Sequence, residues 1–512
     1  MSFHYDFATL KEAILFNTVE VLPSNMEQLD REIQVLVDNA NSSGQPIRHY
    51  IGFEISGQIH FPGSVYQMMN VAELQKAGVE CILWMADYHT WINKKLDGKI
   101  ETIRKVAREY FEPIFRKSLE IAGGDPDKLL VLYAEDEYFK KNENGLSFWD
   151  YEFEIERNIT LSRILRSLSV AGKTAGESTD YQLTRYPGMQ AADIFWHGTH
   201  IVQGGLDQRK IYVLARDNAF NLDQAFQLKM GQKSVKPIIL FTQLLLGLEK
   251  PVAGNFTLDE LETQSPTLER SLEILATTQS EITLTENGQV LEHDETVIQD
   301  LLRVNLEAQN KAKEVNKMSK SKPDSAIWVH DSFEEILRKL KKAYCPGVDW
   351  SGGAEHIWQK IIEEKKRLES MLIGQGLFFT ENKYFIILEL STKSENEIEE
   401  EKQFPEKYKY KRFFKNYLNL QNWNPMLDWC KKMIFPACRV LEIKRPEKYG
   451  GDKSYNNYID LEYDFIFGNI HPMDLKTGVA RCLADWFAPI LDLVKENPEI
   501  LELVKNAKKL LK

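Results

Sequence analysis

The sequence predicts an α/β protein in which a parallel-sheet domain is followed by a mainly α-helical domain, with two insertions. Three observations carry this prediction. Short apolar runs alternate with longer stretches of helical period from His49 to about Thr242, which is typical of strands joined by crossover helices. The 512 residues exceed what one compact core usually holds. A charged, helical pattern returns near the C-terminus.

The strands expected in the first half are short apolar runs at 49–56, 79–87, 128–136 and 236–242. Segments of helical period separate them and are long enough for right-handed crossovers, at about 64–77, 98–122, 147–171 and 207–219. Ligands bind at the carboxyl ends of the strands in such sheets. The residues that follow each strand are therefore the first candidates for a functional site.

Two segments interrupt the second half. The first is acidic, and the second mixes an apolar run with an acidic stretch that we expect to be solvated. The last segment has a helical period that is broken near Pro498, because proline cannot continue a helix. The expected divisions are 1–245, 246–314 (first insertion), 315–347, 348–421 (second insertion) and 422–512.

The composition, with 43% apolar and 27% charged residues, is ordinary for a globular protein. No stretch reaches the roughly eighteen apolar residues of a membrane span, and the N-terminus lacks a signal-peptide pattern, so we expect a cytoplasmic protein without membrane contact. No two cysteines form a CxxC pair, and we expect no metal site and free thiols at Cys81, Cys345, Cys430, Cys438 and Cys482.

The net charge of −12, taken alone, argues against a nucleic-acid partner, because phosphate backbones are usually met by basic surfaces. Local basic runs can override this average. Each such run is also compatible with a solvated helix face. The candidates are Arg209-Lys210, 317–322, 338–342 and 407–415.

The strongest single motif is Lys317-Met318-Ser319-Lys320-Ser321, which precedes a strand-like run at 326–330. Two lysines three positions apart on a loop can meet a triphosphate and stabilise the charge that develops on phosphorus. An exposed basic loop would have the same composition, so the motif needs a second signal.

That second signal follows the first strand, where a glycine-containing turn delivers His60 to the start of a helical segment. The free N–H groups and the dipole of a helix N-terminus favour phosphate. Pro62 fits the first helical turn, where its missing N–H costs nothing. A histidine in such a turn can also be purely structural.

Together, the strand, the histidine turn and the lysine loop resemble the class I aminoacyl-tRNA synthetases. Further stretches resemble the tyrosyl-tRNA synthetases of archaea and eukaryotes, in the family's order: Tyr186-Pro-Gly-Met-Gln190-Ala-Ala-Asp193, Gly204-Gly-Leu-Asp-Gln208-Arg209-Lys210, Lys342-Ala-Tyr-Cys-Pro346, Arg445-Pro-Glu-Lys-Tyr449-Gly-Gly-Asp452 and His471-Pro-Met-Asp474-Leu-Lys. The resemblance implies a Rossmann-like catalytic domain and a helical anticodon-binding domain, and it leaves out the two insertions.

The resemblance also implies an activity. The protein would activate L-tyrosine with ATP and Mg²⁺ and esterify it to tRNA-Tyr, as a homodimer that does not bind DNA. No protein nucleophile is required, because positioning and electrostatic stabilisation do the work. The implied catalytic residues are His60, Lys317 and Lys320. The implied ATP-binding residues are Gly52, Glu54, His60, Gly63, Ser64, Lys317, Met318, Ser319, Lys320 and Ser321.

By the same resemblance, Tyr50 and Asp193 bind the phenol of tyrosine, and the α-ammonium is held by Tyr186, Gln190 and Gln208. An aspartate aimed at the hydroxyl rejects phenylalanine, since a buried acceptor would be left unpaired. Offsets of four and three place the residues at 186, 190 and 193 on one helix face, as in any helix. The implied tRNA-binding residues are Arg166, Arg209 and Lys210 at the acceptor end, and Tyr449, His471 and Asp474 at the anticodon.

One departure from the family keeps an alternative open. The stretch from His60 to Ser64 lacks the second histidine that the family usually has, so a synthetase-like RNA-binding or regulatory protein without catalysis is the rival of another class. The rival within the class is a tryptophanyl-tRNA synthetase, which would need an acceptor for an indole N–H and lacks the Gln-Arg-Lys continuation. Tyr50 with Asp193 favours tyrosine.

Overall fold

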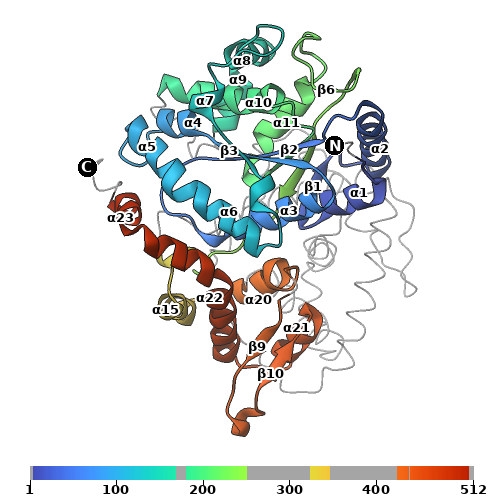
Figure 1. Ribbon diagram of the computed structural model, residues 1–512. Helices are drawn as coiled ribbons and strands as arrows, with labels where there is room; N and C mark the ends of the chain where they lie inside the picture. The colour runs from blue at the N-terminus through green and yellow to red at the C-terminus, as the bar shows by residue number, and fades with distance from the viewer. Residues whose placement is uncertain (1–3, 169–179, 251–322, 346–423, 438, 507–512) are drawn as a thin grey trace, which may run out of the picture.

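The computed structural model describes residues 4–168, 180–250, 323–345, 424–437 and 439–506 (Figure 1). The lysine motif at 317–321 lies outside these ranges, as do nearly all of both insertions.

A six-stranded sheet forms the centre of the first domain, in the order β1-β8-β5-β2-β3-β4 (Figure 1). Neighbouring strands are parallel, except that β1 runs antiparallel to β8 at one edge. The chain runs outward from β2 to β4 and returns to β5 on the other side of β2, so the strand order reverses between β2 and β5. The strands are β1 Thr18–Leu22, β2 Arg48–Phe53, β3 Glu80–Met85, β4 Leu130–Tyr133, β5 Ile201–Gly205 and β8 Ile238–Thr242.

The four predicted strands are confirmed as β2, β3, β4 and β8, whereas the sequence analysis missed β1 and β5. β5 ends in Gly204 and Gly205, and glycine weakens the strand pattern because it offers no side chain to pack. β1 is an edge strand in which only Val21 is fully buried, so it lacks the continuous apolar run of an interior strand.

Helices cover both faces of the sheet. α3 (Val65–Lys76) packs against α6 (Glu112–Ile121) on one side, and α10 (Tyr186–Trp196) packs against α8 (Phe148–Glu156) and α11 (Arg209–Asn218) on the other (Figure 1). α3 and α11 confirm two predicted helices. The shorter or N-terminal helices of this domain are α1 Phe7–Leu15, α2 Met26–Ser43, α4 Asp87–Ile92 and α7 Ala134–Glu137.

The helix predicted at 98–122 forms, but a π-helical turn over Ala107–Phe111 separates α5 (Ile100–Val106) from α6. The Glu112 N–H donates to the Ala107 carbonyl, one residue further back than in an α-turn. Pro113 follows at once and has no N–H to offer the regular ladder, so the wider turn accommodates it.

The prediction of one helix over 147–171 was wrong. α8 ends at Glu156, and α9 (Leu161–Ser167) begins after a turn. The Asn158 side chain donates to the Glu154 carbonyl at 2.8 Å, which gives the backbone an alternative to continuing the helix. Residues 169–171 lie outside the described ranges.

The described C-terminal residues are mainly helical, and the break predicted near Pro498 is confirmed between α22 and α23. A two-stranded antiparallel ribbon, β9 with β10, was not predicted. The elements are α20 Pro425–Trp429, a π-helical segment Cys430–Ile434, β9 Leu441–Ile443, β10 Lys453–Tyr455, α21 Tyr458–Ile466, α22 Pro472–Glu496 and α23 Pro498–Asn506. The predicted domain boundaries stay a prediction.

The C-terminal helices pack directly on the sheet domain. α22 lies against both α6 and α15 (Phe333–Lys342), and the Trp486 indole N–H donates to the Ile121 carbonyl at 3.2 Å. The Phe61 ring meets Trp429 edge-on, with centroids 4.8 Å apart, and lies 5.9 Å from Phe487. The residue after His60 is therefore covered by side chains from the C-terminal part of the chain.

The ends of both insertions meet at one place, which we call the insertion junction and which consists of Leu246–Leu248, Ser325, Tyr344 and Asp428. The Leu248 N–H donates to the Ser325 carbonyl at 3.2 Å, and the Tyr344 N–H donates to the Leu248 carbonyl at 2.8 Å. The Leu246 N–H donates to Asp428 at 3.0 Å. Each insertion thus leaves and rejoins the fold near the same point.

Free thiols are confirmed for the four described cysteines, which are Cys81, Cys345, Cys430 and Cys482. Cys438 lies outside the described ranges. None of the described helices combines the length and the apolar character that a membrane span requires.

Candidate active site

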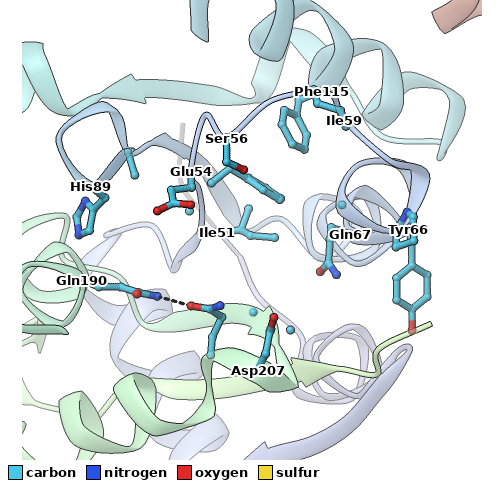
Figure 2. Close-up of a pocket in the computed structure, with 18 of the residues that line it drawn as sticks. Ile51, Glu54, Ser56, Ile59, Tyr66, Gln67, His89, Phe115, Gln190 and Asp207 are labelled. Carbon is cyan, nitrogen blue, oxygen red and sulfur yellow. Dashed lines mark hydrogen bonds between the residues drawn. The ribbon is translucent and has the colours of Figure 1, made fainter. Parts of the chain in front are cut away.

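A cavity of about 310 Å³ lies at the carboxyl ends of the strands, where the strand order reverses (Figure 2). The loop after β2, the start of α4, one face of α10, the turn between β5 and α11, and the residues after β8 all contribute to it. Its lining includes Tyr50, Gly52, Glu54, His60, Gly63, His89, Tyr186, Gln190, Asp193 and Gln208.

The predicted residues of α10 point into the cavity from one face of the helix. Tyr186, Gln190 and Asp193 all line it, as their helical offsets required. Nearly every residue of α10 is buried, so this face is enclosed by protein and is not an ordinary solvated surface. Polar side chains in such a position need partners, because unpaired buried polar groups are costly.

Asp193 and Tyr50 form one end of the cavity. Asp193 is completely buried, and the Tyr50 hydroxyl lies 3.5 Å from its Oδ2, at the outer limit of a hydrogen bond. The Tyr138 hydroxyl donates to Oδ1 at 2.9 Å. His89 Nε2 lies 3.9 Å from Oδ2.

Burial shifts the pKa values of the two titratable side chains Asp193 and His89 at this end of the cavity. It raises the pKa of Asp193 well above its usual range, and the hydrogen bond from Tyr138 only partly opposes this. Burial also lowers the pKa of His89 to about 3. His89 is therefore a neutral imidazole near pH 7, and its approach to Asp193 is not an ion pair.

Gly52 allows Tyr50 to reach its place. A Cβ atom on Gly52 would lie 2.5 Å from the Tyr50 hydroxyl oxygen and 3.3 Å from the Trp84 ring, and the first distance is shorter than any real contact. The absence of a side chain at this position of β2 therefore lets the Tyr50 phenol fold over the strand.

An amide pair lines the cavity about one helical turn before Asp193. Gln190 donates from Nε2 to Gln208 Oε1 at 3.0 Å (Figure 2). The Gln190 Oε1 atom is buried and accepts no hydrogen bond within the described residues. The Tyr186 hydroxyl is hydrogen-bonded to Glu54, and burial, followed by the charge of this carboxylate, raises the Tyr186 pKa. This part of the cavity thus presents acceptor atoms suited to a cation.

Comparison with known proteins identifies the family. A family model described as tRNA synthetases class I (W and Y) matches residues 42–251. The tyrosine–tRNA ligase of Pyrococcus abyssi is 32% identical over 466 residues, covering 91% of each chain, and that of Thermococcus kodakarensis is 32% identical over 470 residues with the same coverage. The chain belongs to the tyrosine–tRNA ligase family. The within-class tryptophanyl alternative is thereby set aside.

A solved member of this family also has the same fold. The tyrosyl-tRNA synthetase of Pyrococcus horikoshii, complexed with L-tyrosine, is 29% identical and superposes with a TM-score of 0.66, covering 98% of this chain and all of that one. The α/β prediction with a class I synthetase fold is confirmed. As a member of an ATP-using family, the chain takes ATP as a substrate.

In this tyrosine–tRNA ligase family member, most predicted ATP-binding residues that the structure describes line the cavity: Gly52, Glu54, His60 and Gly63. His60 Nδ1 accepts the Gly63 N–H at 3.1 Å, so the proton of the neutral ring lies on Nε2. Ser64 is not part of the lining, because it is buried and its hydroxyl faces the His60 and Phe61 carbonyls. The lysine motif, Lys317 to Ser321, lies outside the described residues.

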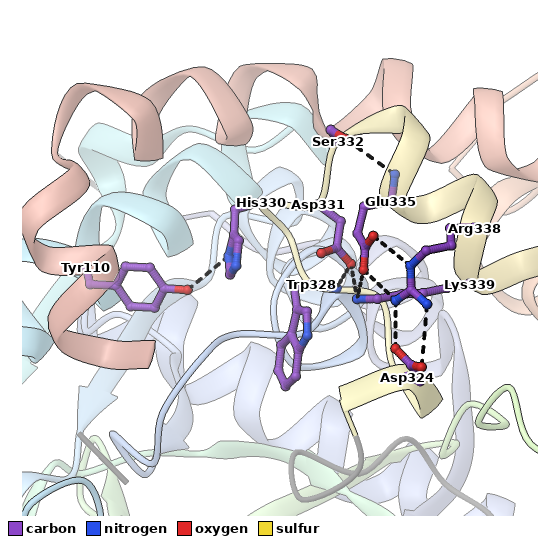
Figure 3. A network of polar contacts seen from close by, with 9 residues as sticks. All are labelled: Tyr110, Asp324, Trp328, His330, Asp331, Ser332, Glu335, Arg338 and Lys339. Atoms are coloured by element: carbon purple, nitrogen blue, oxygen red, sulfur yellow. Dashed lines mark hydrogen bonds and ion pairs between the residues drawn. The ribbon is translucent and has the colours of Figure 1, made fainter. Parts of the chain in front are cut away.

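The residues downstream of the lysine motif are held beside His60. The Phe61 N–H donates to the Ile327 carbonyl at 3.2 Å, and the His60 and Trp328 rings stack with centroids 6.3 Å apart. The prediction of a strand over 326–330 was wrong, since only an isolated bridge between residues 60 and 328 forms. Asp331 accepts the Trp328 N–H at 2.8 Å, and the chain turns there before a ladder can grow (Figure 3).

Two charges of the basic run at 338–342 already have acidic partners (Figure 3). Lys339 is 3% exposed and contacts Asp331 at 2.6 Å. Arg338 is half-buried and pairs with Asp324 at 2.7 Å and with Glu335 at 2.7 Å. These two residues form a structural cluster that fixes the start of α15, so only Lys341 and Lys342 remain of the basic surface expected here.

The residues predicted to meet the acceptor end of tRNA lie on two helices. Arg166 is exposed on α9, and Arg209 and Lys210 are exposed at the start of α11. The Arg209 guanidinium pairs with Glu20 of β1 at 2.9 Å. An incoming phosphate would therefore compete with this carboxylate for Arg209.

The residues predicted at the anticodon lie on neighbouring turns. Tyr449 is 61% exposed in a short 3₁₀ turn, and His471 caps the start of α22, where its Nδ1 accepts the Met473 N–H at 3.1 Å. Arg445 joins the two turns by donating to the Asn469 carbonyl at 2.6 Å. Asp474 lies in the first turn of α22 and is half-buried.

Sequence reasoning missed two residues of the Asp193 end, His89 and Tyr138. Both follow the carboxyl end of a strand, β3 for His89 and β4 for Tyr138. The rule that ligands bind at strand ends could have found them. The motifs used for the prediction came from other parts of the chain.

Proposed function

We propose that this protein is a tyrosine–tRNA ligase that activates L-tyrosine with ATP to tyrosyl-adenylate and transfers the tyrosyl group to the 3′ end of tRNA-Tyr. The observation that carries the proposal is Asp193, a fully buried carboxyl group at the end of the cavity beside Tyr50. A substrate phenol can donate to its Oδ2 atom, which Tyr50 only reaches at 3.5 Å, whereas phenylalanine brings no donor to that atom, and a poorly satisfied buried acceptor is costly.

The part of the cavity around Gln190 suits the α-ammonium group of the same substrate. Gln190 Oε1 is a buried acceptor that is unsatisfied within the described residues, and Tyr186 and Gln208 lie beside it on the cavity lining. An ammonium has three donors and no acceptor, so it fits a group of oxygen acceptors. Tyrosine would thus lie with its ring toward Asp193 and its amino-acid end toward ATP.

The proposed chemistry needs positioning and charge stabilisation. The tyrosine carboxylate attacks the α-phosphorus of ATP in line, and pyrophosphate leaves; the terminal ribose hydroxyl of tRNA then attacks the adenylate carbonyl and releases AMP. His60 Nε2–H lies at the cavity and can donate to a phosphate oxygen. The Gly63 N–H is engaged by His60, and a Cβ atom on Gly63 would lie 3.0 Å from the His60 ring, so the missing side chain leaves room for that ring. Lys317 and Lys320 are proposed to stabilise the leaving phosphates.

We propose that Mg²⁺ enters as an ion carried by the triphosphate, since Mg²⁺ usually keeps several waters and binds through substrate phosphates. Within the described ranges, no group of three His, Cys, Asp or Glu side chains is placed to hold a metal ion. The protein's own part in this step is to orient the phosphates.

We further propose a homodimer and the two predicted tRNA contacts. Phe153 on α8 and Leu161 on α9 are 60% and 66% exposed, and two large apolar side chains on adjacent helices favour burial against a second copy. The acceptor end of tRNA would meet Arg166, Arg209 and Lys210, and the anticodon would meet Tyr449, His471 and Asp474. An exposed tyrosine can stack on an unpaired base, and an aspartate can accept from a base edge.

The test is amino-acid-dependent ATP–pyrophosphate exchange, without tRNA, comparing tyrosine, phenylalanine and tryptophan. We expect kcat/KM for tyrosine to exceed that for phenylalanine and tryptophan by orders of magnitude, and tyrosine-dependent exchange to be lost in Asp193→Ala. Melting temperatures of both proteins check that the variant is folded. Absence of exchange in folded wild-type protein, together with binding of tRNA, would instead support the synthetase-like RNA-binding alternative.

A further inference from the structure

Tyr138 reaches Asp193 from outside the cavity. It follows α7, is completely buried, and does not belong to the cavity lining. Its hydroxyl donates to Asp193 Oδ1 at 2.9 Å, which is the shortest contact described for this carboxyl group. The side chain therefore acts on Asp193 without being able to touch a substrate in the cavity.

The Tyr138 ring is fixed by other aromatic rings. It stacks on Phe148 with centroids 3.5 Å apart and planes 11° apart, and on Tyr88 with centroids 5.5 Å apart. Trp149 and Trp84 lie at 5.4 and 5.6 Å. Because the ring cannot tilt without disturbing these contacts, its hydroxyl oxygen has one position.

The two carboxyl oxygens of Asp193 differ in the strength of their hydrogen bonds. Oδ1 has the short bond from Tyr138, whereas the Tyr50 hydroxyl lies 3.5 Å and neutral His89 lies 3.9 Å from Oδ2. The Trp84 side chain also donates to this carboxyl group. A carboxyl group held by one oxygen cannot turn about its terminal bond without losing that hydrogen bond. Oδ2 is thereby kept at the cavity with capacity to accept one more donor.

We propose that Tyr138 is a positioning residue for amino-acid selection, which holds Asp193 Oδ1 so that Oδ2 faces the phenol of the substrate. This inference rests on the proposed function. Tyrosine uses the positioned oxygen and phenylalanine does not, so removal of the Tyr138 hydroxyl weakens the use of tyrosine alone. A residue that merely supported the fold would affect both amino acids alike.

The test is Tyr138→Phe, which keeps the ring stack and deletes the hydroxyl. In ATP–pyrophosphate exchange we expect kcat/KM for tyrosine to fall about tenfold or more, mainly through KM, because hydrogen bonds to acidic groups have about this worth. For phenylalanine, kcat/KM should stay the same, so the tyrosine-to-phenylalanine ratio falls by the full factor.

Tyr151→Phe is the matched control. Tyr151 is also a buried tyrosine, on α8, but its hydroxyl accepts from Asn142 at 3.3 Å and has no bond to Asp193. Its removal should leave the ratio at the wild-type value. Phe148→Leu is a second variant, which retains the Tyr138 hydroxyl and loosens the stack beneath it, and it should lower the ratio in part.

The outcomes separate the two proposals. No tyrosine-dependent exchange in the wild type would overturn the proposed function, and this inference with it. Exchange in the wild type with an unchanged ratio in Tyr138→Phe, or an equal fall for both amino acids, would overturn only the role of Tyr138. If Tyr138→Phe does not fold, an unchanged ratio in Phe148→Leu has the same force.

Discussion

At the scale of single residues, Gly52 is the cavity residue at which a side chain is least tolerated. Any side chain there would displace the Tyr50 hydroxyl, which lies 2.5 Å from the position of a Cβ atom. We expect Gly52→Ala to raise KM for tyrosine about tenfold, because the phenol of Tyr50 must move away from Asp193. A tenfold change corresponds to a loss of about 1.4 kcal/mol of binding free energy. Steady-state exchange kinetics over a range of tyrosine concentrations measures this.

A double-mutant cycle shows whether this clash is the cause. In the Tyr50→Phe background the hydroxyl is already absent, so Gly52→Ala should add little to the rise in KM. Full additivity of the two changes would mean that Gly52 acts through the backbone of β2 and not through Tyr50.

Glu152 gives the fold a pH dependence. Its side chain is inaccessible on α8, and burial raises its pKa to about 7 although Arg185 lowers it. The folded protein keeps this proton up to about pH 7, whereas the unfolded chain releases it near its ordinary pKa of 4.5. The stabilisation is thus present at low pH and lost as pH rises through this window.

We therefore expect the melting temperature of the wild type to fall relative to Glu152→Gln between about pH 5 and about pH 8. Glu101→Gln, which changes an exposed carboxyl group on α5, should run parallel to the wild type across the same range. Parallel curves for wild type and Glu152→Gln would show that Glu152 is ionised throughout.

Sequence reasoning went furthest where function depends on residue type at a fixed spacing. The family resemblance singled out Tyr186, Gln190 and Asp193, helical period placed them on one face of α10, and the structure brings Tyr50 to that face from β2. It fell short where side chains meet through tertiary packing: Tyr138 contacts Asp193 across 55 positions, and no local pattern records that meeting. Ser64 was placed by motif, but its hydroxyl faces the backbone of the turn.

At the scale of elements, α15 depends on an ion pair that water barely reaches. Lys339 and Asp331 have 3% and 8% exposed side chains, and removal of one partner leaves the other charge buried. We expect Lys339→Met to cost about 3 to 5 kcal/mol of stability, measured by urea denaturation. Arg338→Met, one residue earlier in a solvent-screened pair, should have a much smaller effect on stability.

Individual helices and strands also show why some predictions of secondary structure failed. Periodicity located the segments 98–122 and 147–171, but it does not register one residue added to a turn or a side chain that competes for a carbonyl. Pro113 and Asn158 produce these effects, and each acts on only a few hydrogen bonds. Strands β1 and β5 were missed because edge position and paired glycines obscure the apolar pattern.

At the scale of the whole molecule, the insertion junction predicts that the first insertion can be removed. Leu248 and Ser325 are already hydrogen-bonded, so a short loop can replace a long one at little entropic cost. We expect replacement of 253–310 by about six Gly and Ser residues to leave tyrosine-dependent exchange and tRNA charging unchanged.

Lys320→Ala in the shortened chain should abolish exchange, which would show that the activity still uses the lysine motif. Loss of charging with exchange intact would mean that the first insertion takes part in RNA binding, contrary to its neutral role. Loss of both, in folded protein, would mean that it supports the catalytic domain.

The side chains that cover Phe61 come from the last part of the chain to be synthesised. The residues proposed to hold tyrosine, and the strands around them, are complete at Thr242, whereas the Phe61 ring next to His60 is covered by Trp429 and Phe487, which are made much later. A nascent chain still on the ribosome can thus hold its amino acid long before its nucleotide-binding turn is settled. Incompletely synthesised chains would bind tyrosine without activating it with ATP.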